Sequence, residues 1–147
     1  MASTRTSRLA RIFLDSSVLM AAAISRRGRA HDLLLYGLSR YVDLYLSTDV
    51  LDETERNLLR KAPRGLPAYH RFRSALSLGI VDPPADLVRQ VAAVVEAKDA
   101  PIVAGAIEAH AEYLASYDRK HLLSQKAAIQ AEFGITVATP DEVLAMT

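Results

Sequence analysis

The sequence predicts an α/β fold, a three-layer α/β/α sandwich in which a short, mostly parallel sheet lies between two layers of helices. Short apolar segments of strand length alternate along the chain with segments whose apolar residues recur at helical spacing. The strand-like segments lack a polar residue at every second position, which is typical of parallel strands covered on both faces. The chain has 147 residues, half of them apolar, so one domain with a substantial core is expected.

The predicted elements follow in chain order from these patterns. Residues 1–9 are expected to form a flexible segment and residues 10–147 a single domain. Strands are predicted at residues 10–14, 43–47, 80–81, 112–116 and 135–138. Helices are predicted at residues 18–24, 31–40, 50–61, 68–78, 85–97 and 100–111, with a helix or turn at 120–133 and a last helix beginning at 139–142. A loop is predicted at residues 26–29.

The composition excludes several kinds of site. The chain has no cysteine, so disulfides, thiolate metal sites and cysteine nucleophiles are excluded. No apolar run approaches the roughly 20 residues that span a bilayer, and the first residues do not resemble a signal peptide. We therefore expect a cytoplasmic protein without a membrane partner.

Charge is unevenly divided along the chain. Residues 1–73 hold 13 Lys and Arg against 7 Asp and Glu, whereas residues 74–147 hold 5 against 10. The basic clusters at residues 26–29 and 56–73 are candidates for contacts with phosphates, and a solvated surface is the alternative interpretation.

Four acidic residues fall where an α/β sheet builds its ligand sites. Asp15 and Asp118 come at or just after the ends of predicted strands, and the carboxyl ends of parallel strands share one edge of a sheet. Glu53 lies one turn into the helix after the second strand. Asp99 lies at the start of the helix that leads into the strand before Asp118. The fold therefore allows all four carboxylates to meet at one edge.

Such a cluster has a definite chemistry. Ionised carboxylates raise one another's pKa, and a divalent cation relieves this repulsion. Oxygen ligands without cysteine favour Mg²⁺ or Mn²⁺, and a site of this kind suits the hydrolysis of phosphodiesters.

Each acid also has a purely structural interpretation. Asp99 is a candidate helix cap, Asp118 a candidate turn residue, and Glu53 a candidate solvated helix residue with Glu55 close by. Asp15 is the hardest to explain in this way, because it follows an apolar strand directly, where an unpaired carboxylate is costly.

Five segments of the sequence resemble the conserved blocks of the PIN-domain family. In order they are FLDSSVL at 13–19, LSTDVLDE at 46–53, KDAPIVA at 98–104, YLASYDRKHL at 113–122 and ITVATP at 135–140. The resemblance runs from residue 11 to residue 144. It implies an α/β/α sandwich, Mg²⁺ or Mn²⁺, and cleavage of RNA, and the family includes the toxins of VapBC-type toxin–antitoxin pairs.

On this resemblance we expect a divalent-metal-dependent endoribonuclease, with the toxin of a toxin–antitoxin pair as one role. The resemblance implies that Asp15, Asp99 and Asp118 hold the metal ion. Glu53 would bind a second ion or orient the attacking water, and Glu55 is the alternative if the register differs. The implied partners are RNA, a cognate antitoxin and a second copy of the chain.

Two serines beside the acids have expected roles, and two other residues differ from the family pattern. Ser16 and Ser116 are expected to hydrogen-bond the carboxylates or a phosphate, with ordinary turn residues as the alternative. Tyr117 stands where a small residue is frequent, which predicts a stiffer or partly covered loop before Asp118. Lys120 stands where some members carry a further acid, which predicts a weaker second metal site.

Other functions are also compatible with parts of the sequence. A catalytically weak PIN-fold module that binds RNA or a partner is the main alternative. A haloacid-dehalogenase-type phosphatase needs Asp-x-Asp, but Ser17 stands two positions after Asp15, and a receiver domain needs paired acids that are missing. The four histidines show no ligand spacing, and His121, close to Asp118, is the one worth testing.

Overall fold

Five parallel strands form the centre of the molecule in the computed structural model, which describes residues 8–76 and 79–147. The strands are β1 (Ala10–Leu14), β2 (Val42–Leu46), β3 (Gly79–Ile80), β4 (Tyr113–Ala115) and β5 (Thr136–Ala138). Their order across the sheet is β3-β2-β1-β4-β5, and every neighbouring pair is parallel. The predicted α/β class and parallel sheet are therefore confirmed. The expected flexible segment at residues 1–9 lies mostly outside the described residues.

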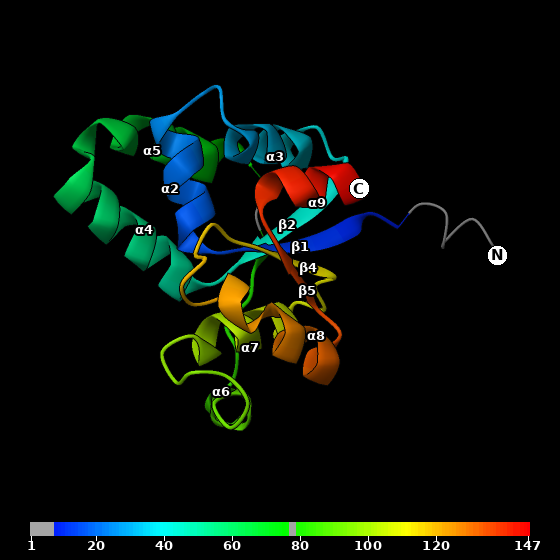
Figure 1. The fold of residues 1–147 in the computed structure, drawn as a ribbon. Coiled ribbons are helices and arrows are strands. Elements are labelled where there is room, and N and C mark those ends of the chain that lie inside the picture. Colours follow the sequence, from blue (N-terminus) through cyan, green and yellow to red (C-terminus); the bar gives the residue numbers. More distant parts are fainter. Residues whose placement is uncertain (1–7, 77–78) are drawn as a thin grey trace.

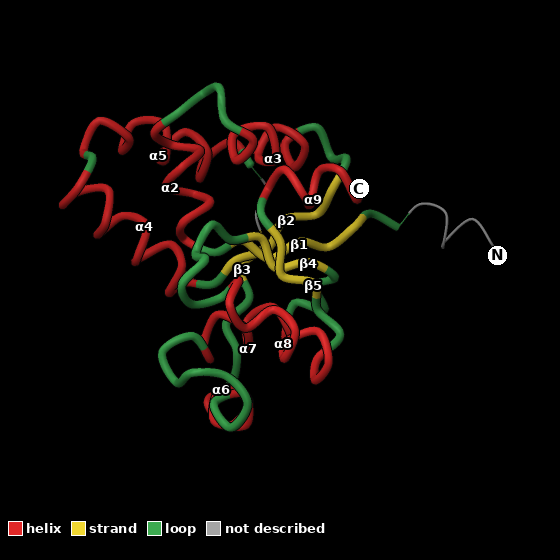
Figure 2. Tube along the Cα trace, viewed as in Figure 1, coloured by secondary structure: helices red, strands yellow, loops and turns green. Residues whose placement is uncertain are grey.

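Helices cover both faces of the sheet, which gives three layers (Figures 1 and 2). One side carries α2 (Ser16–Ile24), α3 (Arg29–Leu38), α4 (Thr48–Lys61), α5 (Leu66–Ala75) and α9 (Pro140–Met146). The other side carries α6 (Ala85–Val91), α7 (Ala100–Glu108) and α8 (Lys126–Phe133). Short 3₁₀ turns at Pro63–Gly65 and Leu123–Gln125 lead into α5 and α8.

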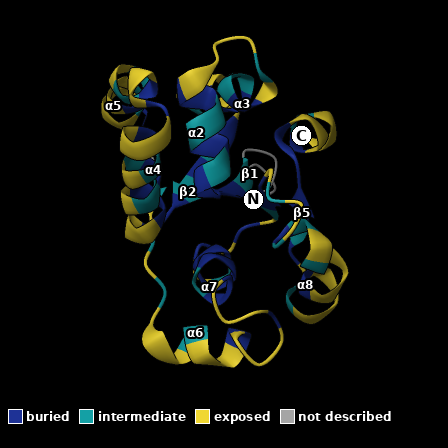
Figure 3. Cartoon of the chain, turned by 60° about the vertical axis from the view of Figure 1, so that its left-hand side comes forward, coloured by how far each residue is buried: buried dark blue, intermediate teal, exposed yellow. Residues whose placement is uncertain are grey.

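The core lies on both faces of the central strand, as the apolar sequence of that strand predicts. Ile12, Phe13 and Leu14 of β1 are fully buried, and α7 is buried along most of its length (Figure 3). A Cβ atom at Gly105 of α7 would stand 2.7 Å from the ring of Phe13. The absence of a side chain at Gly105 therefore lets α7 approach the sheet closely.

One predicted helix is wrong in its extent. The sequence predicts a helix at residues 85–97, but α6 ends at Val91 and turns occupy the residues up to Asp99. The backbone N–H of Glu96 donates to the side-chain Oε1 of Gln125, at 2.9 Å, instead of continuing a helical ladder. A tertiary contact from a residue 29 positions later thus redirects this segment.

The remaining differences concern boundaries. Helix α3 begins at Arg29, inside the predicted loop, and the predicted helix or turn at 120–133 divides into turns, a 3₁₀ turn and α8. The predicted end of the helix at 68–78 falls on residues outside the described part of the chain. Strand ends shift by at most one residue. Within the described residues no helix has the length and apolar character that crossing a membrane requires.

Candidate active site

The site is built at the carboxyl ends of the two central strands, β1 and β4. These strands are paired so that Leu14 lies opposite Ala115, which brings the next residues, Asp15 and Ser116, side by side. The backbone N–H of Asp15 donates to the carbonyl oxygen of Ala115 at 3.1 Å. Asp15 also precedes α2 in extended backbone geometry, but its carboxylate makes no capping hydrogen bond to that helix. The carboxylate of Asp15 is therefore free to face the edge of the sheet.

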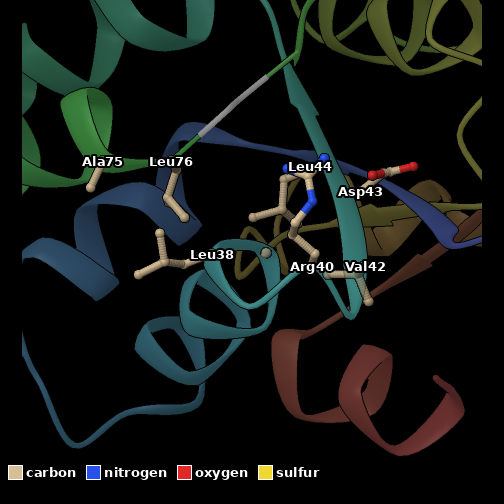
Figure 4. A pocket seen from close by; sticks show the side chains of 8 residues that line it. Leu38, Arg40, Val42, Asp43, Leu44, Ala75 and Leu76 are labelled. Atoms are coloured by element: carbon tan, nitrogen blue, oxygen red, sulfur yellow. The ribbon is translucent and has the colours of Figure 1, made fainter.

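A small cavity lies at the other edge of the sheet, away from Asp15 and Ser116. It has a volume of about 140 Å³ and is lined by the end of α3, the start of β2 and the end of α5 (Figure 4). Arg40 and Asp43 are among its lining residues. Because it lies at the amino end of β2, it is separate from the strand ends at which α/β sheets bind ligands.

Asp15 is buried and held by two hydroxyl groups. Ser17 donates to its Oδ2 atom at 2.7 Å, and Ser116 donates to the same oxygen at 2.9 Å. Burial raises the pKa of Asp15 above its ordinary value, and the negative charge of Glu53 raises it further, although the hydroxyl groups of Ser17 and Ser116 act in the opposite direction. The carboxylate of Glu53 is thus close enough to Asp15 for mutual repulsion.

The serine contacts differ in part from the expectation. Ser116 hydrogen-bonds Asp15 through its side chain, whereas Ser16 acts on Asp15 through its backbone amide. Ser17, which the sequence did not single out, supplies the second hydroxyl. Ser17 also accepts the backbone N–H of Tyr117 at 3.0 Å, so the two strand ends are tied together. The sequence offers no pattern that distinguishes Ser17 from Ser16 in this role.

Asp118 lies in the turn after β4. Its backbone N–H donates to the Oγ atom of Ser116 at 2.9 Å, and its Oδ1 atom accepts the backbone N–H of His121 at 3.1 Å. Ser116 is fully buried between Asp118 and Asp15. One serine hydroxyl therefore connects the two acids that follow the central strands.

Asp99 stands at the start of α7 and is buried, with 8% of its surface exposed. Its side chain makes no capping hydrogen bond to α7, which does not support the interpretation as a helix cap. Its Oδ2 atom accepts instead from the side-chain amide of Gln125 at 2.9 Å. The buried carboxylate is thus oriented by a neighbouring turn.

The two neighbouring acids of α4 have different surroundings. Glu55 accepts a hydrogen bond from Arg73 at 2.7 Å and another from the Tyr69 hydroxyl at 3.0 Å. Glu53, by contrast, is the residue whose charge reaches Asp15. These contacts support Glu53 as the helix-borne acid of the site and give Glu55 a structural role between α4 and α5.

The tightest group of possible metal ligands is not the predicted set. Among the described residues, one group of three or more acidic, histidine or cysteine side chains has ligand atoms within 4.8 Å of one another, and it consists of Glu96, Asp99 and His121. Asp15 and Asp118 are not in this group. Of the predicted acids the structure connects Asp15 with Asp118 through Ser116, and Asp15 with Glu53 through charge.

The four predicted acids form no ion pair in the described part of the chain. The ion pairs there are Arg29–Asp32 and Arg73–Glu55, and neither includes one of these four residues. A buried carboxylate without a cation is unfavourable. Carboxylate oxygens of this kind fit a hard divalent ion such as Mg²⁺ or Mn²⁺.

Comparison with known proteins supports the fold. A family model described as PIN domain matches residues 11–120. No curated protein matches the sequence. Solved structures that resemble the chain in fold include three at 16–22% sequence identity.

The first is PAE2754 from Pyrobaculum aerophilum, with a TM-score of 0.62 and 18% identity, covering 93% of this chain and 88% of that one. The second is VapC20 from Mycobacterium tuberculosis, described as a toxin that cleaves the sarcin–ricin loop, with a TM-score of 0.58, 22% identity and coverage of 83% and 95%. The third is VapBC2 from Rickettsia felis, bound to a promoter DNA fragment, with a TM-score of 0.62, 16% identity and coverage of 88% and 98%.

Proposed function

The chain belongs to the PIN-domain family, and we propose that it is a divalent-metal-dependent endoribonuclease that hydrolyses phosphodiester bonds of RNA. One observation carries the proposal. Asp15 and Asp118 follow the two paired strands β1 and β4 and are connected through Ser116, the charge of Glu53 reaches Asp15, and none of these acids forms an ion pair within the described residues. A site so rich in unpaired carboxylates suits a bound cation and a phosphate substrate.

The proposed roles follow from the contacts of each acid. Asp15, Asp99 and Asp118 would hold Mg²⁺ or Mn²⁺, directly or through water. A bound divalent ion polarises a phosphoryl oxygen and lowers the pKa of a water molecule. Ser17 and Ser116 occupy one oxygen of Asp15 and so fix the direction of the other. Glu53, on α4 and with its charge acting on Asp15, would orient the attacking water.

The basic residues of the first half supply a surface for the RNA backbone. Helices α4 and α5 and the turn between them carry exposed basic side chains. These are Arg56, Arg60, Lys61, Arg64, Arg71 and Arg73. Arg73 is engaged with Glu55, which leaves the others for phosphates. Binding that depends on such residues weakens steeply as salt is added, because phosphate contacts release condensed cations.

The structural neighbours support a more specific role as the toxin of a toxin–antitoxin pair. One of them is described as a toxin that cleaves the sarcin–ricin loop, and another as VapBC2. For this chain we propose a single-stranded or loop RNA substrate, a cognate antitoxin and assembly as a homodimer. Co-purification with the product of a neighbouring gene tests the antitoxin, and light scattering tests the dimer.

A cleavage assay tests the enzymatic proposal. The full chain is freed of metal with a chelator and incubated with end-labelled single-stranded RNA, without added ions and then with Mg²⁺ or Mn²⁺. We expect internal cleavage that requires the added ion. RNA binding without cleavage under either ion would contradict the proposal and indicate a non-catalytic RNA-binding module.

A further inference from the structure

A second group of ligands adjoins the four acids. We propose that Glu96, Asp99 and His121 form a second cation site, which shares Asp99 with the first and binds a transition-metal ion, such as Mn²⁺ or Zn²⁺, in preference to Mg²⁺. The proposal rests on the proposed function only in that Asp99 would belong to both sites. Three observations support it: the short distances among the three side chains, the hydrogen bonds of the Gln125 side chain to these residues, and the contact of His121 with Lys98.

The three residues come from two segments that the fold brings together. Glu96 and Asp99 lie in the turns between α6 and α7, and His121 lies in the turn after β4. One possible ligand atom from each lies within 4.8 Å of the others. An ion with bonds of about 2.0–2.2 Å holds tetrahedral ligand atoms about 3.3–3.6 Å apart, so side-chain movements that bring the atoms closer by at most about 1.5 Å would close the site.

Gln125 contacts all three residues. Its Oε1 atom accepts the backbone N–H of Glu96 at 2.9 Å. Its Nε2 atom donates to Oδ2 of Asp99 and to the carbonyl oxygen of His121, each at 2.9 Å. Both hydrogens of the amide are thus used to orient the residues that carry the ligands. Partners of this kind, one step behind the ligands, are a common feature of metal sites in proteins.

His121 already presents a lone pair to a cation. The ammonium group of Lys98 lies 2.8 Å from its Nε2 atom. Lysine has only donor hydrogens, so Nε2 must accept, and the proton of the neutral ring is on Nδ1. The Nδ1 atom is buried and has no hydrogen-bond partner among the described residues. The ring is therefore held with its acceptor nitrogen toward a positive charge.

Lys98 then acts as an internal competitor of the metal ion. Its side chain is exposed, so it can leave Nε2 without breaking the fold, and a divalent ion would take its place beside His121. Asp99 strengthens this preference for a cation, since it is buried and forms no ion pair in the described part of the chain.

The histidine decides which metal the site prefers. Imidazole nitrogen is a good ligand for Mn²⁺, Co²⁺ and especially Zn²⁺, whereas Mg²⁺ prefers oxygen ligands and keeps its waters. A site of two carboxylates and one imidazole therefore favours the transition metal. The four-acid site, which contains oxygen ligands alone, has no such preference.

Calorimetric titration of the metal-free full chain with Zn²⁺, Mn²⁺ and Mg²⁺ tests this proposal. We expect His121→Gln to weaken Zn²⁺ binding by at least about tenfold and to leave Mg²⁺ binding unchanged. Lys98→Met should strengthen Zn²⁺ binding, because it removes the competing ammonium group. The matched control is His70→Gln, at an exposed histidine of α5, which should bind all three ions as the wild type does. Nitrogen NMR of the His121 ring should show a Zn²⁺-dependent shift of Nε2.

Two further outcomes separate this proposal from the proposed function. In the double variant Asp15→Asn with Asp118→Asn, the four-acid site is lost but His121-dependent Zn²⁺ binding should remain. Equal Zn²⁺ affinity in the wild type, His121→Gln and Lys98→Met would overturn the second site, even if the protein cleaves RNA. If His121→Gln does not fold, the Lys98→Met result and the His121 ring shift decide the question alone.

Discussion

The hydroxyl group of Ser116 donates a 2.9 Å hydrogen bond to the carboxylate of Asp15, 101 positions away in the chain. The same hydroxyl accepts the backbone N–H of Asp118. A single buried oxygen atom therefore sets the positions of the two acids that follow the central strands. The pairing of β1 with β4 makes this contact possible, so the sheet itself aligns the site.

Replacing Ser116 with alanine should therefore slow RNA cleavage while the protein stays folded. We expect a loss of about 1–2 kcal/mol in the free energy of unfolding, because one buried hydrogen bond disappears and a second loses its acceptor. Cleavage should fall because Asp15 loses one of the two hydroxyls that orient it. Ser74→Ala, at an exposed serine of α5, is the control for both measurements and should change neither.

The neighbouring acids of α4 should respond in opposite ways to the loss of charge. Glu53→Gln should lower the cleavage rate by at least about a hundredfold, in the range for a group that orients or activates water, with little change in melting temperature. Glu55→Gln should keep activity and cost at most about 1 kcal/mol of stability, since its pair with Arg73 is half exposed. Loss of activity in Glu55→Gln with full activity in Glu53→Gln would reverse the assignment.

Asp15→Asn should stabilise the metal-free protein. Asp15 is buried without a cationic partner among the described residues, and asparagine has nearly the same shape without the charge. A higher melting temperature than that of the wild type is expected in the presence of a chelator. Added Mg²⁺ or Mn²⁺ should then stabilise the wild type more than the variant. A variant that melts below the wild type in chelator would contradict this account of the site.

A hydrogen bond at the start of α9 should make the stability of the protein depend on pH below about 4.5. Glu142 accepts the backbone N–H of Thr139 at 2.9 Å, and this hydrogen bond, with a further contact to the Thr139 hydroxyl, lowers the pKa of Glu142 below its ordinary value of 4.5. A carboxyl whose pKa falls on folding stabilises the fold above pH 4.5, and this contribution is lost as the pH drops through the lowered pKa. Glu142→Gln should thus melt about 1–3 °C lower than the wild type at pH 7. The difference should shrink below pH 4, and a constant difference would argue against the linkage.

The fold and the position of the site follow from local sequence, because they depend on short-range patterns. Apolar runs predict the strands, and the rule that ligands bind at carboxyl ends of parallel strands predicts where Asp15 and Asp118 lie. That Asp15, Glu53, Asp99 and Asp118 bind metal and act in catalysis stays a prediction. The wrong extent of the helix at 85–97 has a tertiary cause, the contact between Glu96 and Gln125.

The parts that sequence could not supply depend on contacts between distant residues. Glu53 and Glu55 lie two positions apart on one helix, and their roles separate only because Arg73 and Tyr69 lie beside Glu55. Ser17 and Gln125 are ordinary polar residues in the sequence, and their importance appears when the turns that carry them meet the acids.

Single-turnover cleavage of single-stranded RNA by Asp15→Asn tests the central claim most directly. The variant and the wild type are compared at equal concentration with saturating Mg²⁺ or Mn²⁺, after circular dichroism has shown that both are folded. The account predicts that the wild type cleaves and that the folded variant does not, with RNA binding retained. Full cleavage by a folded Asp15→Asn protein would contradict the assignment of the site to the carboxyl ends of β1 and β4.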